Sequence, residues 1–432
     1  MRIAVVGAGI AGMGAAWLLR QAHDVTLYEA AARPGGHSLT VDVPVDGASV
    51  PVDMGFIVYN PPAYPNLTAL FEHLGVPSVA SDMSFAVSLA GGAVEYAGTD
   101  IAGLFGQKRN LVRPRFWSML RDIVRFYREA EADAAWLDPA VSLDAYLTAR
   151  GYGEAFVRDH LLPMAAAIWS TPASRVGDYP ALAFIRFCAN HGLLKLRDRP
   201  QWRTVAGGSR EYVRRLTADL ATGMRLRCPV RAIDRLAGGI LIEAEGAGAE
   251  RYDHVVIATH APEALALLRD PSAAETQLLG ALATSRNVAV MHRDPSLMPR
   301  RRALWSSWNY LGGAEPCVTY WMNRLQPLPA QAGQVFVTLN PTREPRPETV
   351  IRREIFAHPL FDAAAMRAQR ALWGLQGQRR TWFCGAWFGS GFHEDGLQAG
   401  LAVAEAIGGV RRPWHVAAAS GRLPETAQAV AA

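Results

Sequence analysis

The sequence lacks the patterns that hold metal ions and short disulfide frameworks. Its four cysteines lie far apart in 432 residues and form no C-x-x-C pair, which is typical of a protein from a reducing compartment. There is no H-E-x-x-H motif and no cluster of cysteines and histidines, so we expect no metal site. The first glycine-rich turn carries no serine, which argues against a nucleophile elbow. Catalysis by a metal or by an activated serine is therefore not expected.

Long apolar runs are also absent. No stretch approaches the roughly 18 apolar residues that a helix needs to cross a bilayer. The chain starts directly with a strand-like run, which leaves no room for a signal peptide. We therefore expect a cytoplasmic protein, with contact to the inner face of the membrane as a second option.

Charged residues are sparse and slightly biased towards cations. They make up 19% of the chain, and 44 lysines and arginines against 39 acids give a formal net charge of +5. The cations cluster at Lys108–Arg109, Arg113, Arg115, Arg300–Arg302 and Arg379–Arg380. Such clusters either form a solvated face or attract anionic lipid or an acidic substrate. No motif supports nucleic-acid binding, and the oligomeric state stays open.

The first 30 residues contain the most specific pattern. The apolar run Arg2–Val6 predicts a buried parallel strand, and it leads directly into Gly7–Gly12, which reads GAGIAG. A helical run and a second strand follow, ending in Glu29, 20 residues after Gly9. In such a unit the glycines allow a tight turn, close approach of a pyrophosphate and close helix packing, and the acid binds the ribose. The pattern therefore predicts a dinucleotide site.

The continuation distinguishes FAD from NAD. After Glu29 the chain reads AAARPGGH at 30–37, and VDMG follows at 52–55. These motifs resemble the flavin amine oxidase, phytoene desaturase and protoporphyrinogen oxidase superfamily, and most of all bacterial predicted amine oxidases associated with modified fatty acids. The resemblance implies bound FAD, non-covalent in the simplest case, with Arg33 near the diphosphate. For His37 a polar contact, a covalent flavin link and proton transfer all stay open.

The superfamily builds its FAD domain from separate segments, and this sequence divides in the same way. We expect an FAD-binding domain from 1–60, 202–261 and 375–415, a substrate domain from 61–201 and 262–374, and a flexible tail at 416–432. The fold class is α/β: a discontinuous Rossmann-like domain with a parallel sheet, interleaved with an α+β substrate domain that has a mixed sheet and a helical subdomain.

The resemblance also implies a set of cofactor contacts spread over these segments. They are Gly7, Gly9, Ile10, Ala11, Gly12, Glu29, Ala30, Arg33, Gly35, Gly36, His37, Met54, Gly55, Phe56, Val230, Ala258, Gly385, Ala386, Glu394, Asp395, Gly396 and Leu397.

The stretch 385–400, GAWFGSGFHEDGLQAG, resembles the superfamily's C-terminal flavin motif of strand, glycine-rich turn and helix. Backbone N–H groups near Gly396 and Leu397 would face the flavin edge where negative charge develops on reduction. Ala386 stands where many relatives have an acid, so ribitol contacts would come from other groups. His393 is a candidate for proton transfer, although the glycines and the helix end carry most of the meaning of this motif.

The substrate side is rich in aromatic residues, which favours an apolar pocket. We expect the run 168–172 near this pocket, and the aromatic candidates are Trp169, Phe184, Phe187, Trp202, Trp305, Trp308, Tyr310, Tyr320 and Trp321. Beside His393, the candidates for a catalytic role are Tyr310, Tyr320 and Lys195, and His160 and His191 are further ionisable groups to test.

The sequence thus favours an FAD-dependent oxidase or desaturase, in which the flavin performs the chemistry. A hydride would pass to flavin N5 from an apolar substrate, such as a lipid or a modified fatty acyl chain, and oxygen or a quinone would accept the electrons. An amine oxidase, an FAD-dependent isomerase without net oxidation, and a non-catalytic flavin-binding protein are the alternatives.

Overall fold

A five-stranded parallel sheet forms the base of the nucleotide-binding part of the molecule. The computed structural model describes residues 1–169, 176–312 and 317–423. The strand order is β19 (Thr381–Phe383), β13 (His254–Ile257), β1 (Arg2–Val6), β2 (Asp24–Tyr28) and β9 (Met224–Arg225), and every pairing is parallel. Each strand lies inside the three segments from which we expected the FAD-binding domain.

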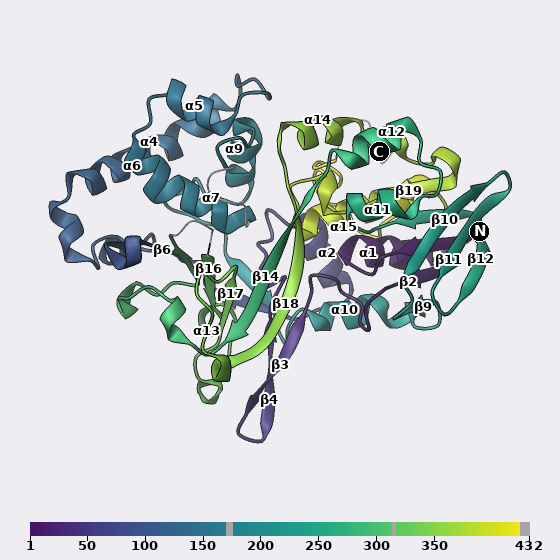
Figure 1. Cartoon of the computed structure of the whole chain (residues 1–432), viewed down its shortest axis with the longest axis horizontal. Coiled ribbons are helices and arrows are strands. Elements are labelled where there is room, and N and C mark those ends of the chain that lie inside the picture. The colour runs from purple at the N-terminus through teal and green to yellow at the C-terminus, as the bar shows by residue number, and fades with distance from the viewer. Residues whose placement is uncertain (170–175, 313–316, 424–432) are drawn as a thin grey trace.

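Two helices cover this sheet and pack closely on each other. Helix α1 (Ile10–Leu19) is buried at every residue, and α15 (His393–Ile407) lies against it (Figure 1). A Cβ on Gly400 of α15 would lie 2.2 Å from the backbone oxygen of Ala11. Glycine at that position therefore sets how closely the two helices approach.

A seven-stranded mixed sheet forms the second layer. Its order is β18 (Val350–Pro359), β14 (Thr284–His292), β17 (Phe336–Leu339), β16 (Cys317–Trp321), β15 (Trp308–Leu311), β6 (Phe85–Leu89) and β7 (Val94–Ala97). Only the β15–β6 pairing is parallel among its described pairings. The smaller sheets are β10 (Val230–Leu236) with β11 (Gly239–Ala244) and β12 (Gly248–Tyr252), β3 (Thr40–Val45) with β4 (Ala48–Asp53), and β5 (Ser78–Ser81) with β8 (Trp202–Val205).

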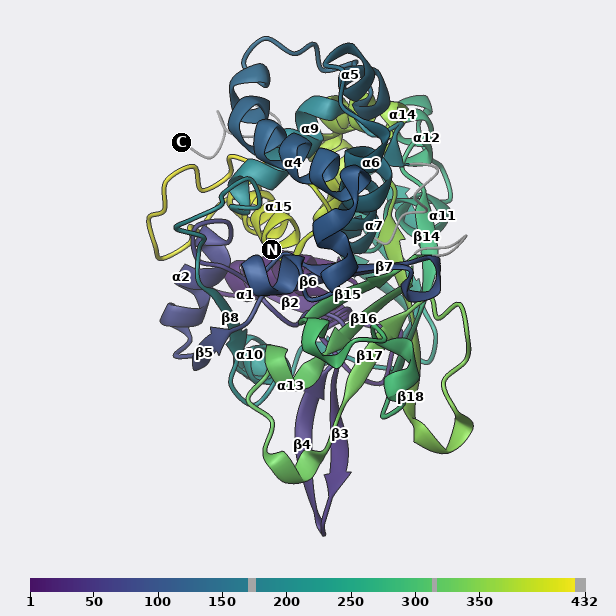
Figure 2. The ribbon, with the colours of Figure 1, turned by 90° about the vertical axis from the view of Figure 1, so that its left-hand side faces the viewer.

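A helical layer lies on the other side of the mixed sheet from the projecting β3–β4 hairpin (Figure 2). It consists of α4 (Pro114–Asp133), α5 (Leu143–Ala149), α6 (Glu154–Phe156), α7 (Leu162–Trp169) and α9 (Ala181–Asn190). Helix α4 turns an apolar face inward through Phe116, Met119, Ile123 and Phe126, as its helical spacing predicts. No helix of the described chain is long and apolar enough to cross a membrane.

The hydrophobic cores divide the chain at slightly different points from the predicted domain boundaries. The core of the parallel sheet also takes in α2 (Pro65–His73), α11 (Ala261–Leu267), α12 (Ala273–Gly280) and α14 (Ala363–Ala371), whose residues lie mostly in the segments assigned to the substrate domain. The expected flexible tail is packed up to residue 423, because Leu423 is buried and Arg422 pairs with Asp395 at 3.1 Å. Its remainder, 424–432, lies outside the described residues.

Candidate active site

A cavity of about 1220 Å³ runs from the carboxyl ends of the parallel strands into the space beneath the helical layer. Its nucleotide end is lined by Gly7, Gly9, Glu29 and Val230, and its substrate end by side chains of the mixed sheet and the helices. The carboxyl edge of an open parallel sheet is where α/β proteins bind their ligands.

The glycine turn after β1 fits a pyrophosphate. Gly7 has a φ of +102°, a left-handed conformation that favours glycine. A Cβ on Gly12 would lie 1.9 Å from the Gly7 oxygen, whereas no described atom lies within 4 Å of a Cβ on Gly9. The open space at Gly9 lies in the cavity wall at the start of α1, where the helix N-terminus favours a phosphate.

Glu29 is held at the end of β2 by two backbone groups. Its carboxylate accepts hydrogen bonds from the Ala8 and Ala31 N–H groups, each at 2.8 Å. A carboxylate has about four acceptor sites, so capacity remains for ribose hydroxyls. The neighbouring walls come from Ala30 and from Val230 at the start of β10, as expected for a site that also holds an adenine.

The middle of the cavity is formed by the segments 35–37, 54–56 and 385–386, which we expected to contact the cofactor. A Cβ on Gly55 would lie 2.0 Å from the His37 oxygen, and the Phe56 N–H donates to that oxygen at 2.9 Å. These contacts fix the 54–56 segment against the 35–37 segment. The predicted residues that line this part are Ile10, Ala11, Gly35, Gly36, His37, Met54, Gly55, Phe56, Ala258, Gly385 and Ala386. The glycine turn, the Glu29 carboxylate and the backbone of these lining segments thus fit FAD.

His393 begins α15 and faces the cavity wall at the middle. Its ring stacks on Phe56 with centroids 3.9 Å apart, and its Nε2 lies 2.9 Å from Ser38 Oγ, which also contacts the Tyr212 hydroxyl. Burial lowers the pKa of His393 to about 3. The imidazole is therefore neutral at pH 7 and a weak base, and its contacts here are the Phe56 ring and the Ser38 hydroxyl.

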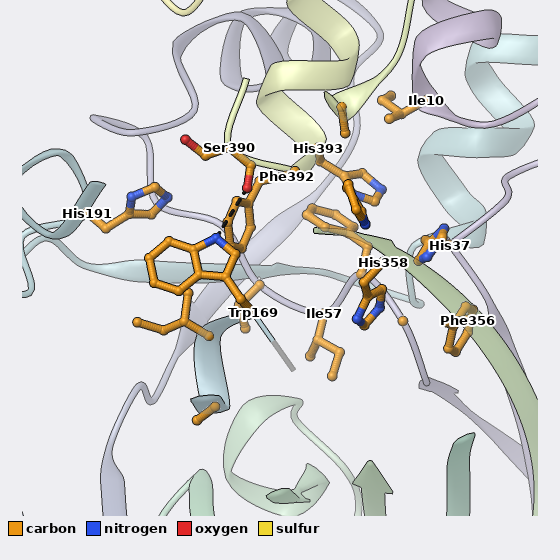
Figure 3. A pocket seen from close by; sticks show the side chains of 18 of the residues that line it. Ile10, His37, Ile57, Trp169, His191, Phe356, His358, Ser390, Phe392 and His393 are labelled. Atoms are coloured by element: carbon orange, nitrogen blue, oxygen red, sulfur yellow. Dashed lines mark hydrogen bonds between the residues drawn. The ribbon is translucent and has the colours of Figure 1, made fainter. Parts of the chain in front are cut away.

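Two further histidines, which the sequence patterns did not indicate, line the cavity beside His37. The His37 ring lies 6.0 Å from His260 and 5.5 Å from His358, between centroids, and its Nε2 lies 3.0 Å from the Ala357 oxygen. Figure 3 shows His37, His358 and His393 on one side of the cavity, opposite Trp169. Burial lowers the pKa of His358 to about 4, with a smaller contribution from His260, and burial followed by the charges of His358 and His260 lowers that of His37. No group of metal-ligating side chains occurs among the described residues.

Several predicted cofactor contacts lie outside the cavity wall. Arg33 donates to the Ser38 oxygen at 3.1 Å and to the Gly36 oxygen at 3.0 Å, so its guanidinium braces the turn. Gly12 and Leu397 lie behind the wall, where α1 and α15 pack. The Gly396 N–H donates to the Phe392 oxygen at 3.1 Å, within the helix. The free N–H groups of α15 belong to the residues before Gly396, since a helix leaves only its first turn unpaired.

The two acids of the C-terminal motif also point into the fold. Glu394 is fully buried and accepts hydrogen bonds from the backbone N–H groups of Asn66 and Leu67, each at 2.9 Å. These two groups lie in the first turn of α2, so the carboxylate caps that helix. Asp395 accepts from the Phe392 N–H at 2.8 Å and pairs with Arg422. Neither acid is a cavity-lining residue.

The other candidate catalytic residues lie in different parts of the structure. Tyr320 lines the substrate end, with its ring 5.0 Å from Trp308. Tyr310 lies in the same sheet but in the core, and Lys195 is an exposed residue away from the wall. His160 and His191 both line the cavity, and burial lowers their pKa values to about 4 and about 3. Neither is charged at pH 7.

The substrate end is predominantly apolar and aromatic. The ring of Phe187 lies 4.6 Å from Trp169, 4.0 Å from His191 and 4.9 Å from Phe392, so these four rings form one wall. Figure 3 labels three of them, Trp169, His191 and Phe392. Further lining residues are Ile57, Val58, Met83, Phe85, Leu120, Ile123, Val124, Met164, Ile168, Trp202, Leu339 and Phe361. The carboxylates among the described lining residues are those of Glu29 and Glu263, both at the nucleotide end. Residues 170–172, which we expected near this pocket, lie outside the described residues.

Comparison with solved structures shows the same fold in an oxidase and in an isomerase. A mutant of putrescine oxidase matches with a TM-score of 0.70 and 16% identity, over 94% of this chain and 99% of that chain. The CLA-producing fatty acid isomerase from P. acnes matches with a TM-score of 0.67 and 17% identity, over 92% of this chain and 96% of that one.

Sequence comparison identifies the family. A putative flavin-containing monoamine oxidase, AofH, of Mycobacterium tuberculosis is 30% identical over 278 residues, which are 62% of this chain and 59% of the relative. The match thus spans about three fifths of that relative's length. The family described as flavin containing amine oxidoreductase matches residues 10–293, well over half of the chain. The protein therefore belongs to the flavin-containing amine oxidoreductase family, and FAD is its cofactor.

Proposed function

We propose that this enzyme removes a hydride from an apolar substrate of the lipid or fatty acyl type. The observation that carries the proposal is the chemistry of the substrate end, where apolar and aromatic side chains line the wall and no described residue offers a carboxylate. A protonated amine would lose its hydration there without gaining a countercharge. An alkyl chain, in contrast, gains free energy in proportion to the apolar area that it buries.

The residues of the chain would act by positioning and by excluding water. FAD, when bound, supplies the hydride acceptor. The wall around Phe187 holds the apolar substrate against the middle of the cavity, and His393 packs on Phe56 beside it. One carbon of the acyl chain would lose a hydride and the neighbouring carbon would lose a proton to solvent, so that a double bond forms. Because His393 is neutral and a weak base, hydride loss would lead this step and deprotonation would follow. Oxygen or a quinone would then accept the electrons.

The competing substrate class is an amine, which the name of the mycobacterial relative favours. The two classes can be separated with ligands matched in chain length. The holoenzyme would be mixed anaerobically with a long-chain fatty acid, its methyl ester, the amine of the same length, and short-chain versions of the acid and the amine. Loss of oxidised-flavin absorbance should follow chain length and not the amino group. Reduction by the amines alone would overturn the proposal.

An isomerase without net oxidation is distinguished by the same experiment run to completion. The fatty acid isomerase that shares this fold shows that the fold accommodates acyl chemistry of that kind. With a net oxidation, the flavin stays reduced when no electron acceptor is present. When a quinone is added, it is consumed in proportion to product. Conversion of the acyl substrate with the flavin still oxidised and no acceptor consumed would assign isomerisation instead.

A further inference from the structure

One surface segment combines exposed apolar side chains with unpaired cations. Between Ile101 and Arg121 the chain contains five cations and no aspartate or glutamate. Ile101 is 77% exposed and Val112 is 79% exposed, which is rare for aliphatic side chains. Leu111 and Trp117 are each 50% exposed. We refer to Ile101–Arg121 as the 101–121 face.

The apolar groups of this face are held in place. The Trp117 indole N–H donates to the Leu111 oxygen at 2.9 Å, and its ring lies 5.3 Å from that of Phe105. Asp100 caps the short helix α3 (Ile101–Leu104) by accepting from the Gly103 N–H at 2.6 Å. A fixed, exposed apolar cluster of this kind marks an interaction site.

The charges of the face are available to a partner. Lys108 and Arg109 are exposed and make no ion pair with any described residue. Arg115 is engaged with Asp159 at 2.8 Å, and Arg113 donates to the Ala93 oxygen at 2.8 Å, so these two hold the fold together. The free charge next to Leu111 and Val112 is therefore that of Lys108 and Arg109.

The cavity opens beside this face. Leu104 and Leu120, which belong to the 101–121 face, line the substrate end of the cavity. Leu196 is 56% exposed and Arg199 is exposed, and both also line the cavity. The cavity therefore reaches the surface at Leu196 and Arg199, and its wall includes two residues of the 101–121 face.

We propose that the 101–121 face docks on an anionic lipid bilayer, with Ile101, Leu111, Val112 and Trp117 entering the headgroup region. The charge pattern selects this occupant, because a bilayer with anionic headgroups complements the free cations and receives the apolar side chains together. A second copy of the chain would bring the same cations against each other. Docking would place the entrance over the acyl region, a consequence that rests on the proposed lipid substrate.

Vesicle sedimentation tests the docking without any substrate. The holoenzyme would be mixed with vesicles of phosphatidylcholine alone and of phosphatidylcholine with phosphatidylglycerol. We expect binding to the anionic vesicles and at least tenfold weaker binding to the neutral ones. Lys108→Gln with Arg109→Gln should weaken anionic binding roughly 30-fold, since each cation near the surface contributes roughly a fivefold factor.

A matched pair of variants tests the apolar part of the face. Val112→Glu should lose vesicle binding at least tenfold, whereas Leu236→Glu, which alters an exposed leucine of β10 on the nucleotide side, should bind as the wild type does. Both should keep bound flavin, which reports on folding. Equal binding by Val112→Glu and wild type, or no binding by the wild type, would overturn the proposal.

Two further outcomes distinguish membrane docking from contacts between copies of the chain and from the proposed lipid substrate. Sedimentation velocity reports the oligomeric state of Val112→Glu. If that state changes and the wild type does not bind vesicles, the face is a contact between copies of the chain, and membrane docking is overturned. Flavin reduction by a detergent-dispersed fatty acid tests the proposed substrate separately. Vesicle binding with no such reduction would leave the docking intact and sink the substrate proposal alone.

Discussion

Glu394 offers the sharpest test of the site's architecture, because its family position suggests a cofactor contact and its geometry makes it a helix cap. Its Oε1 accepts from the Asn66 N–H at 2.9 Å and the Asn66 amide at 3.0 Å, and its Oε2 accepts from the Leu67 N–H at 2.9 Å. The Gln398 amide donates at 2.9 Å. Glu394→Ala leaves two buried backbone donors of α2 without a partner.

The expected cost follows from these contacts. An orphaned buried donor costs about 1–3 kcal/mol, and loss of a helix cap costs about 0.5–2 kcal/mol. We therefore expect Glu394→Ala to lower the free energy of unfolding by about 3–5 kcal/mol. Glu394→Gln keeps the volume and one acceptor, so it should cost about 2 kcal/mol. Glu72→Ala, at an exposed position of the same helix, should stay within about 0.5 kcal/mol of the wild type.

The measurement is urea unfolding of the apoprotein, so that cofactor binding does not contribute to stability, together with FAD titration followed by flavin fluorescence. If Glu394 were a cofactor ligand, Glu394→Ala would weaken FAD binding more than tenfold and leave the apoprotein as stable as the wild type. That result would refute the helix-cap assignment.

The remaining predictions concern the turn, the buried histidines and an exposed lysine. Gly12→Ala should abolish retention of FAD on purification, because its Cβ would lie 1.9 Å from the Gly7 oxygen, whereas Gly9→Ala should fold normally and bind FAD at least tenfold more weakly. His393 has a folded pKa of about 3, below its unfolded value of about 6.5, so the unfolded state binds the proton first and stability is lost as pH falls from about 6.5 towards 3. His393→Phe should therefore flatten the decline of the urea midpoint between pH 6 and 4, and an unchanged slope would contradict this origin. Lys195→Met should leave kcat/KM within twofold of the wild type, since Lys195 is exposed and is not among the residues that line the cavity; a tenfold loss would restore it as a catalytic candidate.

The nucleotide end could be predicted from the sequence because its constraints are local. A tight turn, a close helix and a terminal acid all occur within Gly7–Glu29, and each restricts which residue can stand there. The parallel sheet confirmed the predicted strand at Arg2–Val6 and the second predicted strand, which precedes Glu29. His260 was missed although a signal existed, because it lies three residues after β13, and residues just after a buried parallel strand lie at the ligand-binding edge of the sheet. His358 gave no such signal, since it comes from a long antiparallel strand.

The direction of the acids in the C-terminal motif was also contained in the sequence. Helical residues three, four and seven positions apart share a face, so Glu394 lies on the same side of α15 as Leu397, Gln398 and Leu401. All four are buried. An acid on the buried face of a helix must find donors inside the fold, and Asn66 and Leu67 provide them. Helical register thus predicts an inward carboxylate, which the resemblance of the motif to flavin-binding sequences obscures.

The lining of the substrate end could not be predicted from the sequence, because an aromatic residue in a strand does not show which end of that strand reaches the cavity. Trp308 and Tyr310 lie on one face of β15, two residues apart, or roughly 7 Å along the strand. Trp308 pairs with Tyr320 across the sheet and both line the cavity, whereas Tyr310 pairs with Val318 further along, in the core. Both side chains are aromatic and lie on the same face of β15. Only the packing of β15 against elements distant in the sequence therefore decides which of them meets a substrate. Substrate specificity in this fold is therefore a property of long-range packing, and it has to be measured on matched ligands.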